Sequence, residues 1–306
     1  MMDHRDFLSI RDLSGAEIEE IFARAARFRE AAPPRSLAGR SVVLLFEKAS
    51  TRTRVSFEVG IARLGAHPVV LGVEGSQIAR GEPLKDTARI LAGYCDAIVM
   101  RTFGHERVEE MAAWSDVPVV NALTDLLHPC QVLADCFTLQ QRFGELSGRK
   151  VAWIGDGNNM ANSWINAAAM LGFELTLACP EGFDPDSAIL DAARKDGAVV
   201  LVVHNPREAA RGAIAVNTDV WASMGQEAEA EKRKRAFAGY IVDDALMAEA
   251  DPQAVFMHCL PAHRGEEVTE AVLEGKRSIV WEQAQGRLYI QEAILDFLFQ
   301  QGKETS

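Results

Sequence analysis

Residues 46–54 read FEKASTRTR, and they connect two segments with different patterns. The preceding residues 41–45, SVVLL, form a short aliphatic run that is typical of a buried strand. After the stretch, Phe57, Ile61 and Leu64 follow the spacing of one helix face. The sequence therefore predicts a strand that leads directly into a helix N-terminus, where backbone N–H groups are free and the helix dipole is positive.

Two arginines, Arg52 and Arg54, lie at this predicted N-terminus, where each cation costs about 0.3–1 kcal/mol. The cost is explained if a strongly negative group binds there. Hydroxyl groups of Ser50, Thr51 and Thr53 would join the guanidinium and backbone donors, and such a set of donors suits a phosphate group. The alternative is an ordinary serine or threonine N-cap, with arginines that reach surface carboxylates.

The composition narrows the class of protein. The chain has 306 residues, 48% hydrophobic and 25% charged, which suits two domains of ordinary size. Its net charge of -12 argues against nucleic-acid and anionic-membrane partners. Five scattered cysteines without a CxxC pair indicate reduced thiols in a cytoplasmic protein. The sequence has neither the apolar core of a signal peptide nor a run of about 18 apolar residues, so we expect no membrane segment.

Strand-like and helical segments alternate along the chain. This pattern predicts an α/β fold with two doubly wound domains, each a parallel sheet flanked by helices. Residues 145–150, ELSGRK, look like the boundary between the two. Other predicted segments are a solvated helix at 227–235 with Glu–Arg pairs four residues apart, a strand at 278–281 and a long amphipathic helix at 289–300.

Polar residues recur where predicted strands end. Arg101, Asp219 and Cys259 each follow a strand, and His128 precedes a helix. Taken singly, they could be surface or helix caps, a turn histidine and a small buried thiol. Because ligands of doubly wound folds bind at the carboxyl ends of strands, a shared site is the better interpretation.

Residues 155–160, GDGNNM, also follow a strand and open a helix, as in a dinucleotide site. The third glycine of that fingerprint is missing, since position 160 is Met, and no acidic residue is convincingly placed about 20 positions further on. A nicotinamide oxidoreductase is therefore disfavoured.

Four ordered motifs resemble the aspartate/ornithine carbamoyltransferase family: STRTR at 50–54, HPCQ at 128–131, DVWASMG at 219–225 and HCLP at 258–261. The last two resemble its ornithine-specific members. The resemblance implies a carbamoyl-phosphate-binding domain at 1–143, joined by a C-terminal helix at 288–306 that packs back on it, and an ornithine-binding domain at 144–287. It also implies a homotrimer or a multiple of trimers with active sites at subunit interfaces. We expect no cofactor and no metal.

The family's ligand residues carry over by this matching to named positions. The residues that match carbamoyl phosphate ligands are Ser50, Thr51, Arg52, Thr53, Gln77 from a neighbouring subunit, Arg101, His128, Gln131, Cys259, Leu260 and Arg287. The residues that match ornithine ligands are Asn159, Asp219, Ser223 and Met224. The catalytic candidates are Arg101, His128, Cys259 and Asp219.

The chemistry agrees with these roles. Thr53, Arg101 and His128 could donate hydrogen bonds to the carbonyl oxygen of carbamoyl phosphate. The side-chain amine of L-ornithine would attack directly, through a tetrahedral intermediate, and give L-citrulline and phosphate. Asp219 suits an ammonium group and so favours a diamino acid over aspartate, which leaves putrescine as the alternative acceptor. A non-catalytic binding protein is the alternative of another class. Arginine biosynthesis is the default role, and a cis Leu260-Pro261 bond is a further hypothesis.

Overall fold

A computed structural model describes residues 4–72, 77–222 and 229–301 of the protein. The chain divides into two compact units. The first unit contains residues 1–134 and 285–306, and the second contains residues 135–284. The functional boundaries expected at 143/144 and 287/288 remain a prediction.

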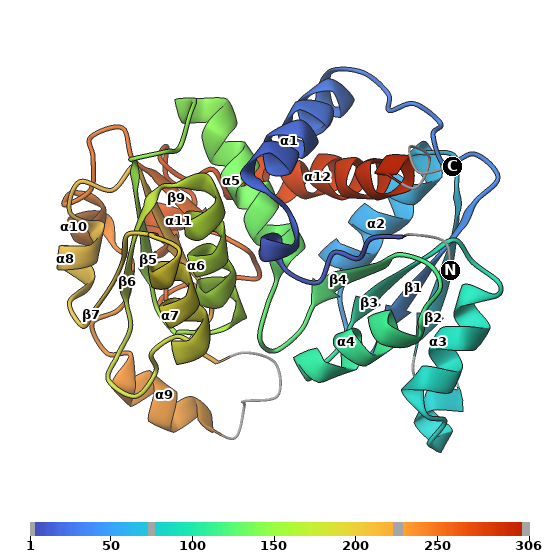
Figure 1. Ribbon diagram of the computed structural model, residues 1–306. Helices are drawn as coiled ribbons and strands as arrows, with labels where there is room; N and C mark the ends of the chain where they lie inside the picture. Colours follow the sequence, from blue (N-terminus) through green and yellow to red (C-terminus); the bar gives the residue numbers. More distant parts are fainter. Residues whose placement is uncertain (1–3, 73–76, 223–228, 302–306) are drawn as a thin grey trace. The chain divides into compact units, whose positions relative to one another are not determined.

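The first unit is built on one parallel sheet. Its strands are β1 (Ser41–Phe46), β2 (His67–Gly72), β3 (Ala97–Arg101) and β4 (Val119–Leu123). They are ordered β2–β1–β3–β4 (Figure 1). Its helices are η1 (Ile10–Asp12), α1 (Gly15–Glu30), α2 (Arg52–Arg63), η3 (Gln77–Arg80), α3 (Leu84–Ala92), α4 (His105–Trp114) and parts of α5 (Pro129–Phe143) and α12 (Val280–Gln301).

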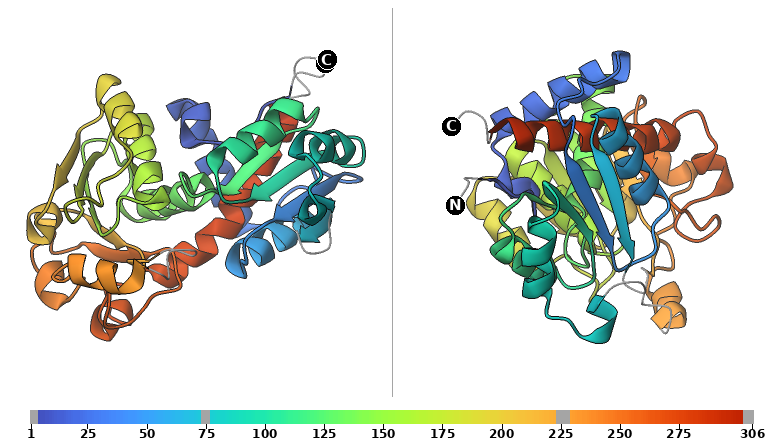
Figure 2. Two further views of the ribbon diagram at one scale, coloured as in Figure 1. Left: turned by 90° about the horizontal axis from the view of Figure 1, so that it is seen from below. Right: turned by 90° about the vertical axis from the view of Figure 1, so that its right-hand side faces the viewer.

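Both faces of this sheet are covered. Val43 of β1 packs in one buried cluster with Leu84 of α3 and Met111 of α4. Leu44 points to the opposite face, because successive side chains of a strand alternate, and it is fully buried. Helices α2 and α12 lie over that second face (Figure 1; Figure 2).

The C-terminal part of α12 completes the first unit. Arg24 of α1 forms a buried ion pair with Asp296 at 2.5 Å. Arg287 donates a hydrogen bond to Thr53 Oγ1 at 2.7 Å. The last helix therefore packs on the first unit, as the resemblance implied, and it begins at Val280, earlier than the helix predicted at 289–300.

The second unit contains a parallel sheet of five strands. They are β5 (Lys150–Ile154), β6 (Glu174–Ala178), β7 (Val200–Val203), β8 (Ala215–Thr218) and β9 (Val255–His258). Their order is β7–β6–β5–β8–β9. Its helices are α6 (Asn159–Leu171), α7 (Ser187–Lys195), α8 (Pro206–Ala210), α9 (Ala230–Ala236), α10 (Asp244–Met247) and α11 (Glu270–Leu273), with the remaining parts of α5 and α12.

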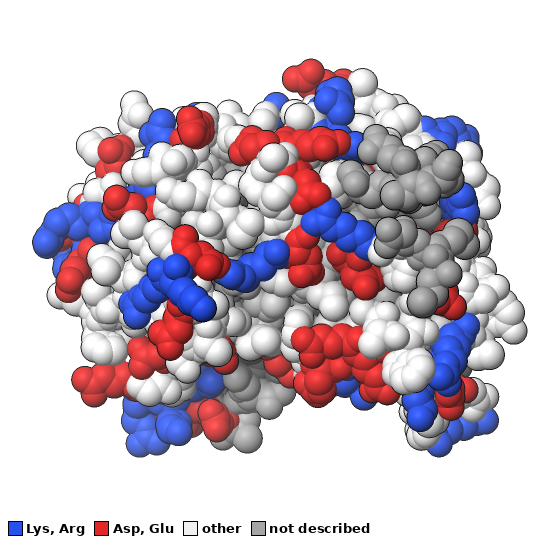
Figure 3. All heavy atoms as spheres, viewed as in Figure 1, with Lys and Arg blue, Asp and Glu red and all other residues white. Residues whose placement is uncertain are grey.

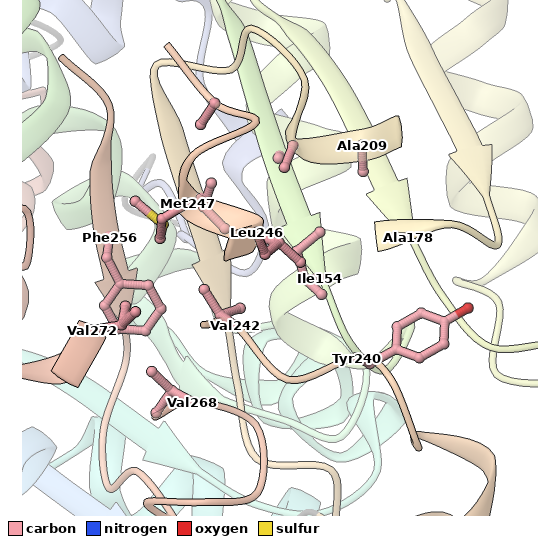
Figure 4. Packing of buried hydrophobic residues seen from close by; sticks show 14 of the residues in the cluster. Ile154, Ala178, Ala209, Tyr240, Val242, Leu246, Met247, Phe256, Val268 and Val272 are labelled. Atoms are coloured by element: carbon pink, nitrogen blue, oxygen red, sulfur yellow. The ribbon is translucent and has the colours of Figure 1, made fainter. Parts of the chain in front are cut away.

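One buried cluster joins this second sheet to the helices that follow it. Ile154 of β5 and Phe256 of β9 pack with Val242, Leu246 and Val272 (Figure 4). Each of these residues exposes at most 4% of its surface to solvent. The predicted α/β class with two sheets flanked by helices is thus confirmed.

Each sheet has one point where the strand order reverses. In the first unit the chain runs from β1 to β2 on one side and then returns to place β3 on the other side of β1. In the second unit β5 is likewise flanked by β6 and β8. Ligands of open α/β sheets bind at the carboxyl ends of strands beside such a point.

The strand predicted at 278–281 is wrong. Ser278 makes only an isolated bridge to Phe256, and α12 begins two residues later at Val280. The local pairing is real, because Ile279 N donates to Phe256 O at 3.0 Å. A short apolar run cannot be assigned to strand or helix by its pattern alone, and here the helix continues it.

Other expectations concern the surface and the thiols. All five cysteines lie among the described residues, and none of them forms a disulfide. In the described parts of the chain, no helix is both long and apolar enough to cross a membrane. On the face drawn in Figure 3, Lys and Arg are scattered among Asp and Glu and form no broad basic area.

A buried carboxyl group on α12 makes the stability of the first unit depend on pH. Glu292 is fully buried beside Arg63, with Nε and Oε1 3.2 Å apart. Burial raises the pKa of Glu292 to about 7, and Arg63 offsets only part of this shift. The carboxyl group of Glu292 therefore binds its proton more tightly in the folded state than in the unfolded chain. This difference stabilises the folded state at low pH, and the stabilisation is lost as pH rises through about 7.

Glu292→Gln should remove this dependence. We expect its free energy of unfolding, relative to the wild type, to rise by about 2 kcal/mol between pH 5.5 and 8.5. Urea unfolding at the two pH values measures this difference. Glu58→Gln, at a half-buried glutamate of α2, is the matched control and should follow the wild type at both pH values. Parallel curves for Glu292→Gln and the wild type would contradict the assignment.

Candidate active site

The first predicted site lies where β1 leads into α2. Helix α2 begins at Arg52, as predicted, and Thr51 is its N-cap residue. Thr51 makes no side-chain cap hydrogen bond, so the alternative of an ordinary threonine cap is wrong for this residue. Thr51 and Arg52 are exposed and Ser50 is half-buried. Arg54 lies 3.4 Å from Glu58 on its own helix and is half-exposed.

Buried polar residues from four elements belong to the same unit. Arg101 ends β3, His128 precedes α5, Gln131 lies in the first turn of α5 and Arg287 lies on α12; all four are at least nine-tenths buried. Burial excludes a surface cap for Arg101. Thr53 of α2 is also buried and accepts the hydrogen bond from Arg287.

The environment of His128 fixes its charge. Burial lowers the pKa of His128 well below its usual value, and the positive charges of Arg287 and Arg101 lower it further. The imidazole is therefore neutral near pH 7. A neutral imidazole can still donate one hydrogen bond, and it adds no positive charge of its own to this cationic region.

Gln77 is the predicted ligand contributed by a neighbouring subunit. It begins η3 and is exposed. Its exposure leaves it accessible to another chain.

The second unit carries the predicted acceptor residues around Asp219. Asp219 follows β8, and Cys259, just after β9, donates from Sγ to Asp219 Oδ1 at 3.1 Å. Asn158 donates from Nδ2 to Asp219 Oδ2 at 3.0 Å, and Val220 N donates to Oδ1 at 2.8 Å. Asn159 begins α6 immediately after Asn158. Asp219 is thus a buried hydrogen-bond centre at the reversal point of the sheet rather than a helix cap.

The HCLP turn is fixed by His258. The peptide bond Leu260-Pro261 is cis, which confirms the hypothesis from the sequence. Leu260 has a φ of 59°, which is costly for a side chain of this kind. Its N–H donates to His258 Nδ1 at 2.8 Å, so Nδ1 carries no proton and Nε2 donates to Glu267 at 3.1 Å.

The same hydrogen bonds decide whether this region suits a metal. Asp219, His258 and Cys259 bring one ligand atom each to within 4.8 Å of one another. Both ring nitrogens of His258 are already engaged by Leu260 and Glu267. The group is therefore better described as a hydrogen-bonded turn than as a metal centre.

The predicted residues thus fall into two groups. Those of the first unit are Ser50, Thr51, Arg52, Thr53, Gln77, Arg101, His128, Gln131 and Arg287; those of the second are Asn159, Asp219, Cys259 and Leu260. Ser223 and Met224 lie outside the described residues.

Two family models match the chain in this same order. Residues 5–141 match the carbamoyl-P binding domain of aspartate/ornithine carbamoyltransferase, and residues 147–298 match its Asp/Orn binding domain. A relative from Geobacter sulfurreducens named ornithine carbamoyltransferase is 53% identical over 95% of this chain and 98% of its own length. The chain belongs to the aspartate/ornithine carbamoyltransferase family.

Solved structures of family members agree with the fold. The ornithine carbamoyltransferase from Pyrococcus furiosus matches with a TM-score of 0.91 and 44% identity, over 96% of both chains. An anabolic ornithine carbamoyltransferase from Campylobacter jejuni matches with a TM-score of 0.93 and 40% identity, over 97% of this chain and 99% of that one.

The glycine motif GDGNN has a packing function in this family member. A Cβ atom at Gly157 would lie 2.2 Å from Pro185 N and 2.5 Å from Asp184 O. Gly157 N also donates to Phe183 O at 2.8 Å. The glycine is therefore required by the close approach of another backbone segment, which explains the motif without a dinucleotide.

The predicted solvent exposure of residues 227–235 is wrong for Arg233. It lies on α9, in the segment predicted as a solvated helix, yet it is buried. Its guanidinium group contacts Asp156 Oδ2 at 2.7 Å and Trp221 O at 2.9 Å, and lies 5.0 Å from the centre of the Phe183 ring. The predicted pairing with Glu229 is present at 3.6 Å. The only hint was Asp156, because an acidic residue at the end of a buried strand needs a cation.

Replacement of Arg233 should destabilise the second unit. Arg233→Met leaves Asp156 buried and unpaired, so we expect the free energy of unfolding to fall by roughly 3–5 kcal/mol. The matched control is Arg235→Met on the exposed side of the same helix, with an expected change within about 0.5 kcal/mol. Denaturant unfolding compares the two, and equal effects would contradict the anchoring role of Arg233.

His128 should remain neutral across the physiological range. Its pKa in the folded state lies below that of the unfolded chain, near 6.5, so acid favours unfolding through this residue. In NMR spectra of histidine-labelled protein, we expect the resonance that is lost in His128→Asn to stay constant between pH 5.5 and 8.5. Free histidine in the same buffer is the reference, and a midpoint near its own pKa would refute a neutral His128.

Proposed function

We propose that this protein transfers the carbamoyl group of carbamoyl phosphate to the side-chain amine of L-ornithine and releases L-citrulline and phosphate. The observation that carries the proposal is that each unit contains a polar site and that the two sites are chemically opposite. Each lies at the strand reversal of its own sheet: donors and cations in the first unit, and the carboxylate of Asp219 in the second.

The first unit would bind carbamoyl phosphate. The phosphate group is held by the N-terminus of α2, by hydroxyls of Ser50, Thr51 and Thr53, and by Arg52, with Gln77 supplied by a neighbouring subunit. The ligands of the carbamoyl end are Arg101, His128 and Gln131, and the shell is completed by Cys259, Leu260 and Arg287. This assignment is supported by the burial of the carbamoyl set in the first unit.

These residues would activate the carbonyl carbon. Arg101, Thr53 and His128 donate hydrogen bonds to the carbonyl oxygen as it gains negative charge. His128 does so as a neutral imidazole, which is supported by its lowered pKa. Because these donors are positioned before the reaction, little reorganisation is needed in the transition state.

The second unit would bind L-ornithine. Asp219 pairs with an ammonium group, and Asn159, Ser223 and Met224 are the other ligands. Cys259 orients the reacting amine or accepts its proton. This role is supported by the hydrogen bond that the Cys259 thiol donates to Asp219 at 3.1 Å. An alkyl ammonium group in water has a pKa of about 10.4, so the site must favour the neutral amine before attack.

The reaction then needs no covalent enzyme intermediate. The amine nitrogen forms a bond to the carbonyl carbon, which gives a tetrahedral intermediate. Its collapse breaks the bond between that carbon and the phosphate oxygen. Phosphate leaves with the electron pair, and the nitrogen loses a proton as citrulline forms.

The acceptor is identified by charge. Aspartate would need a cation for its second carboxylate, whereas Asp219 offers an anion. Putrescine, the alternative acceptor, also carries two amines but has no carboxylate. The relatives from Geobacter sulfurreducens and Pyrococcus furiosus are named ornithine carbamoyltransferases, which favours ornithine over this alternative.

Three wider features belong to the same proposal. Residues 1–143 with 288–306 form the carbamoyl phosphate domain, and residues 144–287 form the ornithine domain. The protein assembles as a homotrimer or a multiple of trimers, so that Gln77 completes the site of a neighbour. It works in the cytoplasm in arginine biosynthesis; the similar enzyme from Campylobacter jejuni, named an anabolic ornithine carbamoyltransferase, supports the biosynthetic role.

The test is citrulline formation from carbamoyl phosphate and ornithine, beside aspartate and putrescine at equal concentrations. We expect turnover with ornithine, and a loss of about 100-fold or more in kcat/KM for Arg52→Ala. Arg54→Ala is the matched control, since Arg54 pairs with Glu58, and it should stay near the wild type.

The other outcomes separate the parts of the proposal. If product formed with putrescine but not with ornithine, the assignment of the carbamoyl phosphate site would stand. The assignment of Asp219 as a ligand of an amino acid would then be wrong. Binding of carbamoyl phosphate without turnover of any amine would favour a non-catalytic binding protein. Equal activity of Arg52→Ala and the wild type would refute the phosphate site.

A further inference from the structure

A buried carboxylate follows β1 directly, at the start of the loop that leads to Ser50. The side chain of Glu47 is 5% exposed. Arg107 of α4 contacts it twice, with Nη2 2.5 Å from Oε1 and Nε 3.0 Å from Oε2. Thr102 donates its hydroxyl to the same carboxylate, and Arg107 Nε also lies 3.2 Å from that hydroxyl. This two-pronged contact is the strong, directional form of an ion pair.

The Glu47 contacts connect two loops of the candidate site. Glu47 N donates to Arg101 O at 2.8 Å, and its side chain holds Thr102, the next residue. The segment before Ser50 is therefore bound to the segment that carries Arg101 by both backbone and side chain. Because these two loops flank the strand reversal of the first sheet, their relative position sets the distance between the phosphate and carbamoyl donors.

A neighbouring pair extends this connection to a third loop. Lys48 is buried, forms an ion pair with Asp125 and lies 4.5 Å from the centre of the Phe103 ring. Asp125 follows β4 and comes three residues before His128. Glu47 and Lys48 thus connect neighbouring loops. The Lys48–Asp125 ion pair is partly open to solvent because Asp125 is mostly exposed, whereas Glu47 is buried. Loss of the Glu47–Arg107 ion pair should therefore cost more free energy than loss of the Lys48–Asp125 pair.

The charge of Glu47 also matters for an anion nearby. A carboxylate left without its cation would repel a phosphate group and would be costly in a buried position. Arg107 neutralises that charge from α4, outside the loop itself. Arg107 is part of no motif in the sequence, and only the structure brings it to Glu47.

We propose that Glu47 and Arg107 are positioning residues of the carbamoyl phosphate site, which hold the loop of Ser50 to Thr53 in register with Arg101. This inference rests on the proposed function, since it assigns the pair to the phosphate half of that site. Neither side chain touches the substrate. Its consequence is that phosphate affinity depends on Arg107 although Arg107 contributes no ligand.

The experiment titrates inorganic phosphate into the full-length protein by calorimetry. We expect Arg107→Met to weaken phosphate binding about tenfold, because a displaced donor set loses much of its effect. Arg107→Lys should recover part of the loss, since lysine keeps the charge but not the two-pronged geometry. Glu47→Gln combined with Arg107→Met should bind better than Arg107→Met alone, because no unpaired carboxylate remains.

The matched control lies at the opposite end of the same strand. Arg40 pairs with Asp96 at 2.5 Å, and Asp96 accepts from Ser41 N at the start of β1. Arg40→Met removes an ion pair that braces β1 but not the loop, so its phosphate affinity should equal that of the wild type. Phosphate affinity of Arg107→Met within twofold of the wild type, or an equal loss in Arg40→Met, would overturn the proposal.

Steady-state kinetics distinguish a displaced phosphate site from a general loss of stability, because only the former changes the KM of one substrate selectively. In Arg107→Met we expect the KM for carbamoyl phosphate to rise about tenfold, with a much smaller change in the KM for ornithine. An equal rise of both would overturn the assignment to the phosphate half. If the wild type binds phosphate but makes no citrulline, the proposed reaction fails while the phosphate titrations still test Glu47 and Arg107.

Discussion

All strands within each sheet run parallel, and the positions of the functional residues depend on this constraint. Parallel strands bring their carboxyl ends to one edge, together with the positive N-termini of the helices that follow. Where the order reverses, two loops separate and leave room for a ligand. In the first unit this edge gathers Arg52 and Arg101; in the second it gathers Asn159 and Asp219. Residues that lie far apart in the sequence are thus brought together at one edge of each sheet.

The sites of the two units carry opposite charges, and in both units an arginine from a nearby helix neutralises a buried carboxylate. The first concentrates positive charge around His128 and keeps that imidazole neutral by burial. The second concentrates carboxylates and gives Asp156 a cation from α9, because an unpaired buried charge costs several kcal/mol. In both units, the compensating arginine lies on a helix that provides no proposed ligand: α4 for Glu47 and α9 for Asp156.

Much of this organisation could be predicted from sequence, and the exceptions have a common cause. The elements around residues 46–54 were predicted nearly to the residue, because strand and helix periodicity are local properties. The strand expected at 278–281 is wrong because three consecutive apolar residues, 279–281, fit either a strand or a helix. Arg233 was assigned to a solvated surface because its i, i+4 partner was visible, whereas its true partner, Asp156, is 77 positions away. Glu47 and Arg107 escaped notice for the same reason: a buried ion pair is defined by tertiary distance, and neither residue type is unusual by itself.

The return of α12 to the first unit sets the order in which the protein can be built during translation. Domains generally fold as they are synthesised, the N-terminal one first. Here the first unit lacks Arg287, Glu292 and Asp296 until the segment that contains them, which follows the whole second unit, has left the ribosome. The face of α2 that packs against α12 must remain uncovered while the whole second unit is made. The nascent chain therefore carries an incomplete first unit while residues 135–284 are synthesised.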